Sequence, residues 1–171
     1  MSETNLSMLC YASTATGKCS SIEIGLIIDV SHHNNARLQV TGALFFGNNY
    51  FLQFLEGSRH NLNLLYNKIV RDERHENIQV LELKEIGSRC FPEWSMKYVR
   101  SPNVAAKIYR AAGLKEFNPY LLDSAALNAM ALAFRNHHEP NEVQRTLTGQ
   151  STEISKKTSS FDILKLFGRG T

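Results

Sequence analysis

The sequence predicts an α+β fold of the ferredoxin-like type for about its first hundred residues, followed by a helical pair. Apolar segments with strand and helix periods occur in the order strand, helix, strand, strand, helix, strand, with one further strand. Both faces of the central hairpin are apolar, so both faces of the sheet must be covered. The length of 171 residues suits one domain with an appendage better than two domains.

Each element of this domain is predicted from the period of its apolar residues. Alternation in the first strand defines the face that carries Tyr11. The first helix is capped by Ser20 or Ser21, and its inward stripe begins apolar and ends at Asn35. The second hairpin strand carries Gln53 in the middle of an apolar face. The expected strands are 6–12, 40–46, 50–56, 80–86 and 95–100, and the expected helices are about 21–35 and 59–71.

The C-terminal part is predicted to supply the lid for the second sheet face. Helices are expected at about 103–112 and 120–136, and the apolar stripe of the latter is Leu122, Ala125, Ala129, Met130 and Phe134. Residues 139–160 are rich in Ser, Thr, Gln, Glu and Lys, which is typical of a disordered tail. The short apolar segment 161–167 is either a docking helix or part of that tail. We therefore expect a sensory domain at 1–100, a helical unit at 101–138 and a tail at 139–171.

Composition excludes several classes of function. The net charge is only +3 with mixed signs, so we expect no direct nucleic-acid binding. Runs long enough to span a membrane and a secretory signal are both lacking, which favours a cytoplasmic protein. Cys10, Cys19 and Cys90 fit neither a disulfide framework nor a metal knuckle, so reduced thiols are expected. The six histidines show no metal-ligand spacing.

A hydrolase is the alternative from another class, because acylphosphatase-type enzymes share this topology. Those enzymes use an Arg in the loop after the first strand, where this chain offers Lys18. A nucleotide-binding loop at 12–19 is equally unsupported, because Ala12 and Cys19 replace the required Gly and Ser or Thr.

Three polar residues are expected to meet in one apolar layer. The strand phases direct Tyr11 and Gln53 to the helix-covered face, and Asn35 ends the helix that covers it. Each residue alone is compatible with an ordinary buried polar group bonded to backbone. Together they suit a flat heterocycle with donors and acceptors on its rim, held between Ile27 and Ile69.

Several motifs resemble those of BLUF domains, which sense blue light with a flavin. They are LCYAS at 9–13, NNAR at 34–37 followed by VTG at 40–42, FLQFLEG at 51–57, Asp72 with Arg74 and His75, and FPEWSM at 91–96. The resemblance covers residues 6 to 100 in order. It includes no hydrolase or cyclase output domain, so the chain resembles the short, stand-alone class of the family.

The resemblance implies roles for particular residues. Tyr11 matches the light-active tyrosine and Gln53 the switching glutamine, while Trp94 and Met96 match a pair on the fifth strand that relays the signal. The residues matching the flavin-binding positions are Asn35, Asn34, Gln53, Ile27, Ile69, Lys68, Asp72 and His75.

The resemblance further implies a receptor and not an enzyme. FAD is the implied cofactor, with FMN or riboflavin as substitutes, and light is expected to produce a small red shift that recovers in the dark. We expect the signal to reach a separate partner protein, and the chain to form a homo-oligomer. A light-blind interaction module of the same fold is disfavoured, because Tyr11, Asn35 and Gln53 are all present.

Overall fold

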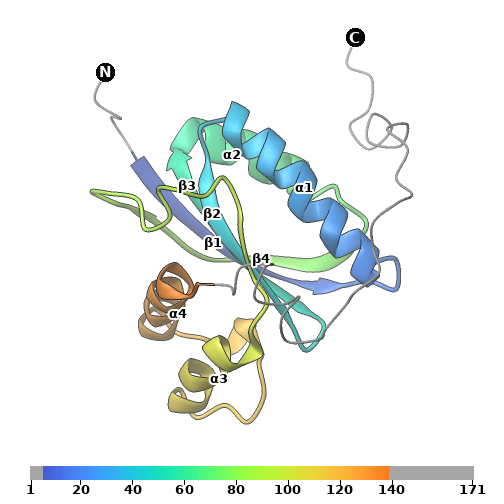
Figure 1. The fold of residues 1–171 in the computed structure, drawn as a ribbon, viewed down its shortest axis with the longest axis vertical. Coiled ribbons are helices and arrows are strands. Elements are labelled where there is room, and N and C mark those ends of the chain that lie inside the picture. Colours follow the sequence, from blue (N-terminus) through green and yellow to red (C-terminus); the bar gives the residue numbers. More distant parts are fainter. Residues whose placement is uncertain (1–5, 139–171) are drawn as a thin grey trace, which may run out of the picture. The chain divides into compact units, whose positions relative to one another are not determined.

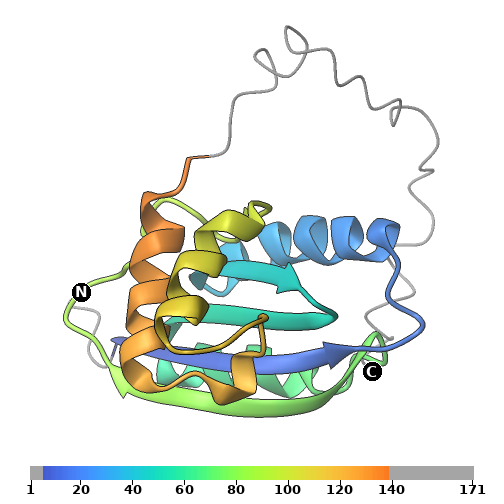
Figure 2. The same ribbon diagram turned by 90° about the horizontal axis from the view of Figure 1, so that it is seen from below.

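The computed structural model describes residues 6–138, in which a five-stranded sheet lies between two pairs of helices. Figure 1 shows α1 and α2 on one side of the sheet and α3 and α4 on the other, and Figure 2 shows the second pair lying across its sheet face. The predicted tail at 139–171 and its segment 161–167 lie outside the described residues. The elements are β1 (Leu6–Ala15), α1 (Ser21–Arg37), β2 (Thr41–Gly47), β3 (Tyr50–Ser58), α2 (Arg59–Ile69), β4 (His75–Glu85), β5 (Lys97–Val99), α3 (Pro102–Ala111), a 3₁₀ turn η1 (Pro119–Leu121) and α4 (Ser124–Asn136).

The sheet order β4-β1-β3-β2-β5 confirms the predicted ferredoxin-like arrangement with an added strand. The first four strands pair antiparallel, whereas β5 runs parallel to β2. Two separate cores result, because alternate residues of every strand point to opposite faces. One core lies under α1 and α2 and contains Tyr11 and Leu55. The other lies under α3 and α4 and contains Phe54, Met130 and Phe134.

Several predicted boundaries were wrong. β1 continues to Ala15, past its predicted end at residue 12, and β4 begins at His75 and not at Val80. That region is the outer edge of the sheet, so its polar side chains reach solvent. β5 has three residues and not six, and α2 ends at Ile69, two residues before its predicted end.

The last helix is shorter than predicted, and a different set of its residues faces the core. α4 starts at Ser124 because Asp123 is its N-cap, accepting a hydrogen bond from the backbone N of Ala126 at 2.8 Å. Ala125 and Ala129, predicted to face the core, are exposed. The buried residues of α4 are Ala126, Leu127, Met130, Ala131 and Phe134.

Gly42 is required where β2 meets β3 and the segment before β5. A Cβ atom at this position would lie 2.0 Å from the backbone oxygen of Phe54, and the Gly42 N–H donates to the Trp94 carbonyl at 3.1 Å. We expect Gly42→Ala to lower the free energy of unfolding by about 3 kcal/mol, as overpacking against backbone does. Gly25 in α1 is the matched control, because a Cβ there meets nothing within 4 Å.

Urea denaturation of both variants checks this prediction. Gly25→Ala is expected to raise the free energy of unfolding by about 0.5–1 kcal/mol, since alanine is the better helix residue. Equal stabilities for the two alanine variants would contradict the close approach at Gly42.

Candidate functional site

Tyr11 and Gln53 are brought together by the register of two neighbouring strands. They are direct partners across the antiparallel pair β1 and β3, so their side chains leave the sheet on the same face. Both are 4% exposed, and the Tyr11 hydroxyl donates a hydrogen bond to Gln53 Oε1. Burial raises the pKa of Tyr11, with the Asp72 charge as a smaller contribution in the same direction. The phenol therefore keeps its proton at every physiological pH and can act as a hydrogen-bond donor.

Met96 receives the other end of the Gln53 amide. Gln53 Nε2 donates to Met96 Sδ at 3.4 Å, and Met96 is almost fully buried. A thioether is a weak acceptor, so this bond holds the amide less firmly than an oxygen acceptor does. A half-turn of the amide would direct its NH₂ group at Tyr11 and its oxygen at Met96.

Trp94 and Met96 lie on opposite sides of the sheet, although the family resemblance implied a pair on one strand. Met96 belongs to the core under α1 and α2, whereas Trp94 packs against the core under α3 and α4. The reason is that β5 begins only at Lys97, so strand alternation does not govern Trp94 and Ser95. Met96 is thus the member of the pair that contacts Gln53.

Asn35 joins α1 to the segment between Trp94 and Met96. It is 1% exposed near the end of α1, and its Nδ2 donates to the Ser95 carbonyl at 2.8 Å. His32 Nδ1 lies 3.2 Å from the Ser95 hydroxyl. Asn34 is half-buried beside Asn35. The contact of His32 was missed from sequence, since a histidine on an exposed helix face has no distinguishing pattern.

Ile27 and Ile69 line the layer between the two helices of this face. Both are partly buried and pack against the core that contains Tyr11. Tyr66 of α2 adds an edge-to-face contact to Tyr11, with ring centroids 5.9 Å apart.

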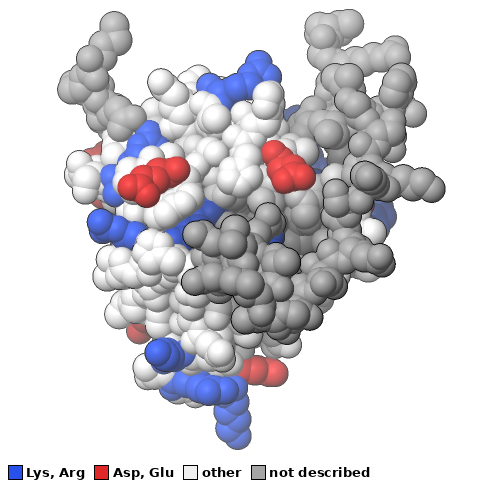
Figure 3. Space-filling model, in the orientation of Figure 1, with Lys and Arg blue, Asp and Glu red and all other residues white. Residues whose placement is uncertain are grey.

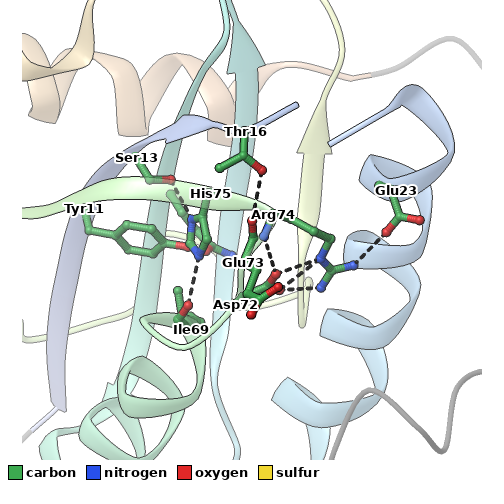
Figure 4. Close-up of polar contacts among 10 residues, drawn as sticks. Tyr11, Ser13, Thr16, Glu23, Ile69, Asp72, Glu73, Arg74 and His75 are labelled. Atoms are coloured by element: carbon green, nitrogen blue, oxygen red, sulfur yellow. Dashed lines mark hydrogen bonds and ion pairs between the residues drawn. The ribbon is translucent and has the colours of Figure 1, made fainter. Parts of the chain in front are cut away.

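His75 is fixed at the junction of α2 and β4 (Figure 4). Its Nε2 lies 2.9 Å from the Ile69 carbonyl, and a carbonyl can only accept, so Nε2 carries the hydrogen. Its Nδ1 lies 2.8 Å from the Ser13 hydroxyl. His75 therefore holds the last turn of α2, and with it Ile69, against β1.

Asp72 and Arg74 close the same end of the layer. Arg74 Nε donates to Asp72 Oδ1 at 2.9 Å, and Arg74 Nη1 reaches Glu23 of α1 at 3.4 Å (Figure 4). Burial alone would raise the pKa of Asp72, but the hydrogen bonds and charge of Arg74 outweigh it and lower the pKa. Asp72 is therefore ionised. Lys68 is exposed on the last turn of α2.

Glu56 is a buried carboxylate that sequence reasoning missed. It is 0% exposed, and its two oxygens accept hydrogen bonds from the backbone N–H groups of Cys90 and Phe91 at 2.8 and 2.9 Å. Arg89 Nη1 donates to the Glu56 backbone carbonyl at 2.7 Å. Burial raises the pKa of Glu56, although these hydrogen bonds oppose the shift. Glu56 thereby anchors the loop that leads to Trp94 and Met96.

Two classes of feature are lacking within residues 6–138. The described residues contain no group of three or more His, Cys, Asp or Glu side chains placed to hold a metal ion. None of the helices between residues 6 and 138 is long and apolar enough to cross a membrane. Cys10, Cys19 and Cys90 are free thiols.

The side chains of this layer fit a flavin. A flavin ring needs apolar contact on its faces and both donors and acceptors at its polar edge. Ile27 and Ile69 offer apolar contact from two helices. The amides of Asn35 and Gln53 offer hydrogen-bond donors and acceptors. The hydrogen bond of Gln53 to a weak sulfur acceptor leaves its NH₂ group able to turn to a better partner.

Comparison with known proteins agrees with this site. The family described as "Sensors of blue-light using FAD", or BLUF, matches residues 6–97. Photoactivated adenylate cyclase subunit beta of Euglena longa is 34% identical over 95 residues, covering 55% of this chain and 11% of that protein. The blue light- and temperature-regulated antirepressor BluF of Escherichia coli (strain K12) is 31% identical over 71 residues. These cover 42% of this chain and 18% of the antirepressor. This chain thus spans less than a fifth of the length of either relative.

Two solved structures are similar over more of the chain. The photo-activated state of BlsA aligns with a TM-score of 0.73 and 31% identity, covering 80% of this chain and 99% of BlsA. The dark state of BlrB aligns with a TM-score of 0.63 and 30% identity, covering 77% of this chain and 97% of BlrB. The family match and these BLUF relatives leave the acylphosphatase-type alternative without support, although it shares the topology. The chain therefore belongs to the BLUF family of blue-light sensors, which use a bound flavin.

Proposed function

We propose that light acts in this chain by rearranging the hydrogen bonds of Gln53. One observation carries the proposal: the Tyr11 phenol, the Gln53 amide and the Met96 sulfur form a continuous buried chain of hydrogen bonds. Its central member is an amide, which can exchange donor and acceptor ends by turning. Such a group has two discrete arrangements, as a switch requires.

The flavin we propose is FAD, held between α1 and α2. Ile27 and Ile69 would contact the ring faces, and Asn35, Asn34 and Gln53 would bond its polar edge. Lys68, Asp72 and His75 would lie toward the polar tail, at the end of the layer that Arg74 closes. FMN or riboflavin would satisfy the same ring contacts.

Tyr11 and Gln53 divide the light reaction between them. A bound flavin supplies the absorption of blue light and, once excited, a strong oxidant. Tyr11 would donate an electron to the excited flavin, and because its phenol becomes far more acidic on oxidation, its proton would pass to Gln53 Oε1 while Gln53 Nε2 gives up a proton toward the flavin. The Gln53 amide then rotates or tautomerises. When the electron and proton return, Tyr11 is restored while Gln53 keeps a different set of partners.

We infer that the output is a binding event and not a reaction of this chain. Residues 1–100 would form the sensory domain, and residues 101–138 would present a light-dependent surface to a separate partner protein. The named outputs of the relatives differ, a cyclase and an antirepressor, so the shared part is the sensor. A homo-oligomer in the cytoplasm is part of the same proposal.

The charge on the face drawn in Figure 3 suits a protein partner better than nucleic acid. Figure 3 shows basic and acidic side chains in small separate groups among uncharged residues, with a basic group at the α3 end. A nucleic-acid footprint would need a continuous basic stripe.

A capture experiment in the dark and under blue light tests this proposal. Immobilised chain loaded with FAD is exposed to an extract of its own cells, and eluted proteins are quantified together with the oligomeric state. We expect at least one protein whose recovery depends on light with the parent chain and does not with Tyr11→Phe. Equal recovery in both conditions would contradict a light-dependent binding surface.

A further inference from the structure

Lys97 is a buried lysine directly beside the residue that contacts Gln53. It is 7% exposed, which is unusual for a lysine. As a residue of β5 it pairs with Ala43 of β2, and it follows Met96 in the chain. Lys97 Nζ nevertheless lies on the α3 and α4 side, because it donates to the Arg135 carbonyl of α4 at 3.0 Å. Met96 thus faces Gln53, and the next residue, Lys97, faces α3 and α4.

The surroundings of the ammonium group explain why it remains buried. Arg135 lies in the last turn of α4, where helix carbonyls lack partners within the helix and the helix dipole is negative. On another side, Lys97 Nζ is 4.0 Å from the centroid of the Trp94 ring, whose face attracts a cation. The charge is therefore held jointly by the segment before β5 and by the end of α4.

This arrangement forms a short path through the sheet. Gln53 contacts Met96 on one face, and the next residue grips the end of α4 on the other. The loop that leads to Trp94 is anchored separately by Glu56 at Cys90 and Phe91, so the chain on that side of Met96 is held in place. Met96 and Lys97 are adjacent in the chain, so a displacement of Met96 would reach Lys97 through a single peptide bond.

We propose that Lys97 is the positioning residue that couples Gln53 to the last turn of α4. The inference rests on the proposed function, since it takes Gln53 as the switch. In the dark arrangement Lys97 caps the Arg135 carbonyl. Rearrangement of Gln53 moves Met96 and Lys97, the cap is weakened, and the last turn of α4 becomes the part of the surface that responds to light.

Hydrogen exchange of the FAD-loaded full chain, in the dark and under continuous blue light, tests the proposal. In the parent chain we expect light to speed exchange in the last turn of α4, including the His137 amide that bonds the Ala133 carbonyl, by about fivefold. That factor corresponds to the loss of one hydrogen bond of ordinary net strength.

Lys97→Met removes the ammonium and keeps the length of the side chain. We expect its light-to-dark exchange ratio at α4 to fall to about one, with the flavin red shift retained, because Lys97 Nζ bonds α4 on the opposite side of the sheet from Gln53 and Met96. Lys107→Met is the matched control, being the same change at an exposed position of α3, and should keep the parent ratio. The chain has one tryptophan, so its dark emission should differ from the parent in Lys97→Met and not in Lys107→Met.

Three results would each contradict a different part of the proposal. If the parent chain shows a normal flavin shift but a light-to-dark exchange ratio of one at α4, the coupling to α4 is wrong. A parent-like ratio in Lys97→Met would overturn the role of Lys97, and Lys97→Gln, which also removes the charge, replaces this variant if it does not fold. Absence of any flavin shift in the parent chain would instead contradict the proposed function itself.

Discussion

Gln53→Leu is expected to bind flavin and to lose essentially the whole reversible red shift. Leucine fills a similar volume but neither accepts the Tyr11 hydrogen bond nor donates to Met96, so the two arrangements of the amide no longer exist. Tyr11→Phe is expected to lose the normal photocycle for the complementary reason that the phenol is gone. Light-minus-dark absorption spectra of the loaded proteins measure both effects.

Gln79→Leu is the matched control for this experiment. It makes the same chemical change on β4 at an exposed position, opposite Ala12 of β1. Its spectrum and dark recovery should equal those of the parent chain. A parent-like photocycle in Gln53→Leu or in Tyr11→Phe would show that the residue roles assigned here are wrong.

Glu56→Ala should have the largest effect on stability among the charged residues of the sheet. Removal of the carboxylate leaves the partly buried Cys90 N–H group and the buried Phe91 N–H group without their acceptor. Each such group costs about 1–3 kcal/mol, so we expect the free energy of unfolding to fall by about 3–5 kcal/mol. Urea denaturation followed by circular dichroism measures the loss.

Two further variants give this prediction its specificity. Glu56→Gln keeps one acceptor oxygen and should lose about half as much. Glu85→Ala removes an exposed glutamate whose ion pair with Arg59 spans 3.5 Å, and should cost about 0–1 kcal/mol. If Glu56→Ala were no more costly than Glu85→Ala, the loop before β5 would not depend on this anchor.

Local patterns were sufficient to predict the face that carries Tyr11 and Gln53. Alternation in two strands and the apolar hairpin determine that face, and the register of β1 and β3 then makes the two residues direct partners. The covering of the second face by a helical pair followed from the apolar character of both hairpin faces, and is confirmed.

Glu56 and Lys97 were not predictable in the same way. A charged residue in a strand usually lies on a solvated face, and only the loop at Cys90 and the end of α4 make these two positions buried. These contacts join residues 34 to 38 positions apart, so no local period records them. The resemblance gave Trp94 and Met96 only as a pair on the fifth strand, and because β5 begins at Lys97, strand alternation could not place them.

The absorption spectrum of the purified full chain, loaded with FAD and measured before, during and after blue illumination, tests the central claim most directly. We expect a yellow protein whose flavin bands shift to the red under blue light and return completely in the dark. A chain that binds no flavin, or whose bound flavin gives the same spectrum in darkness and in light, would contradict it.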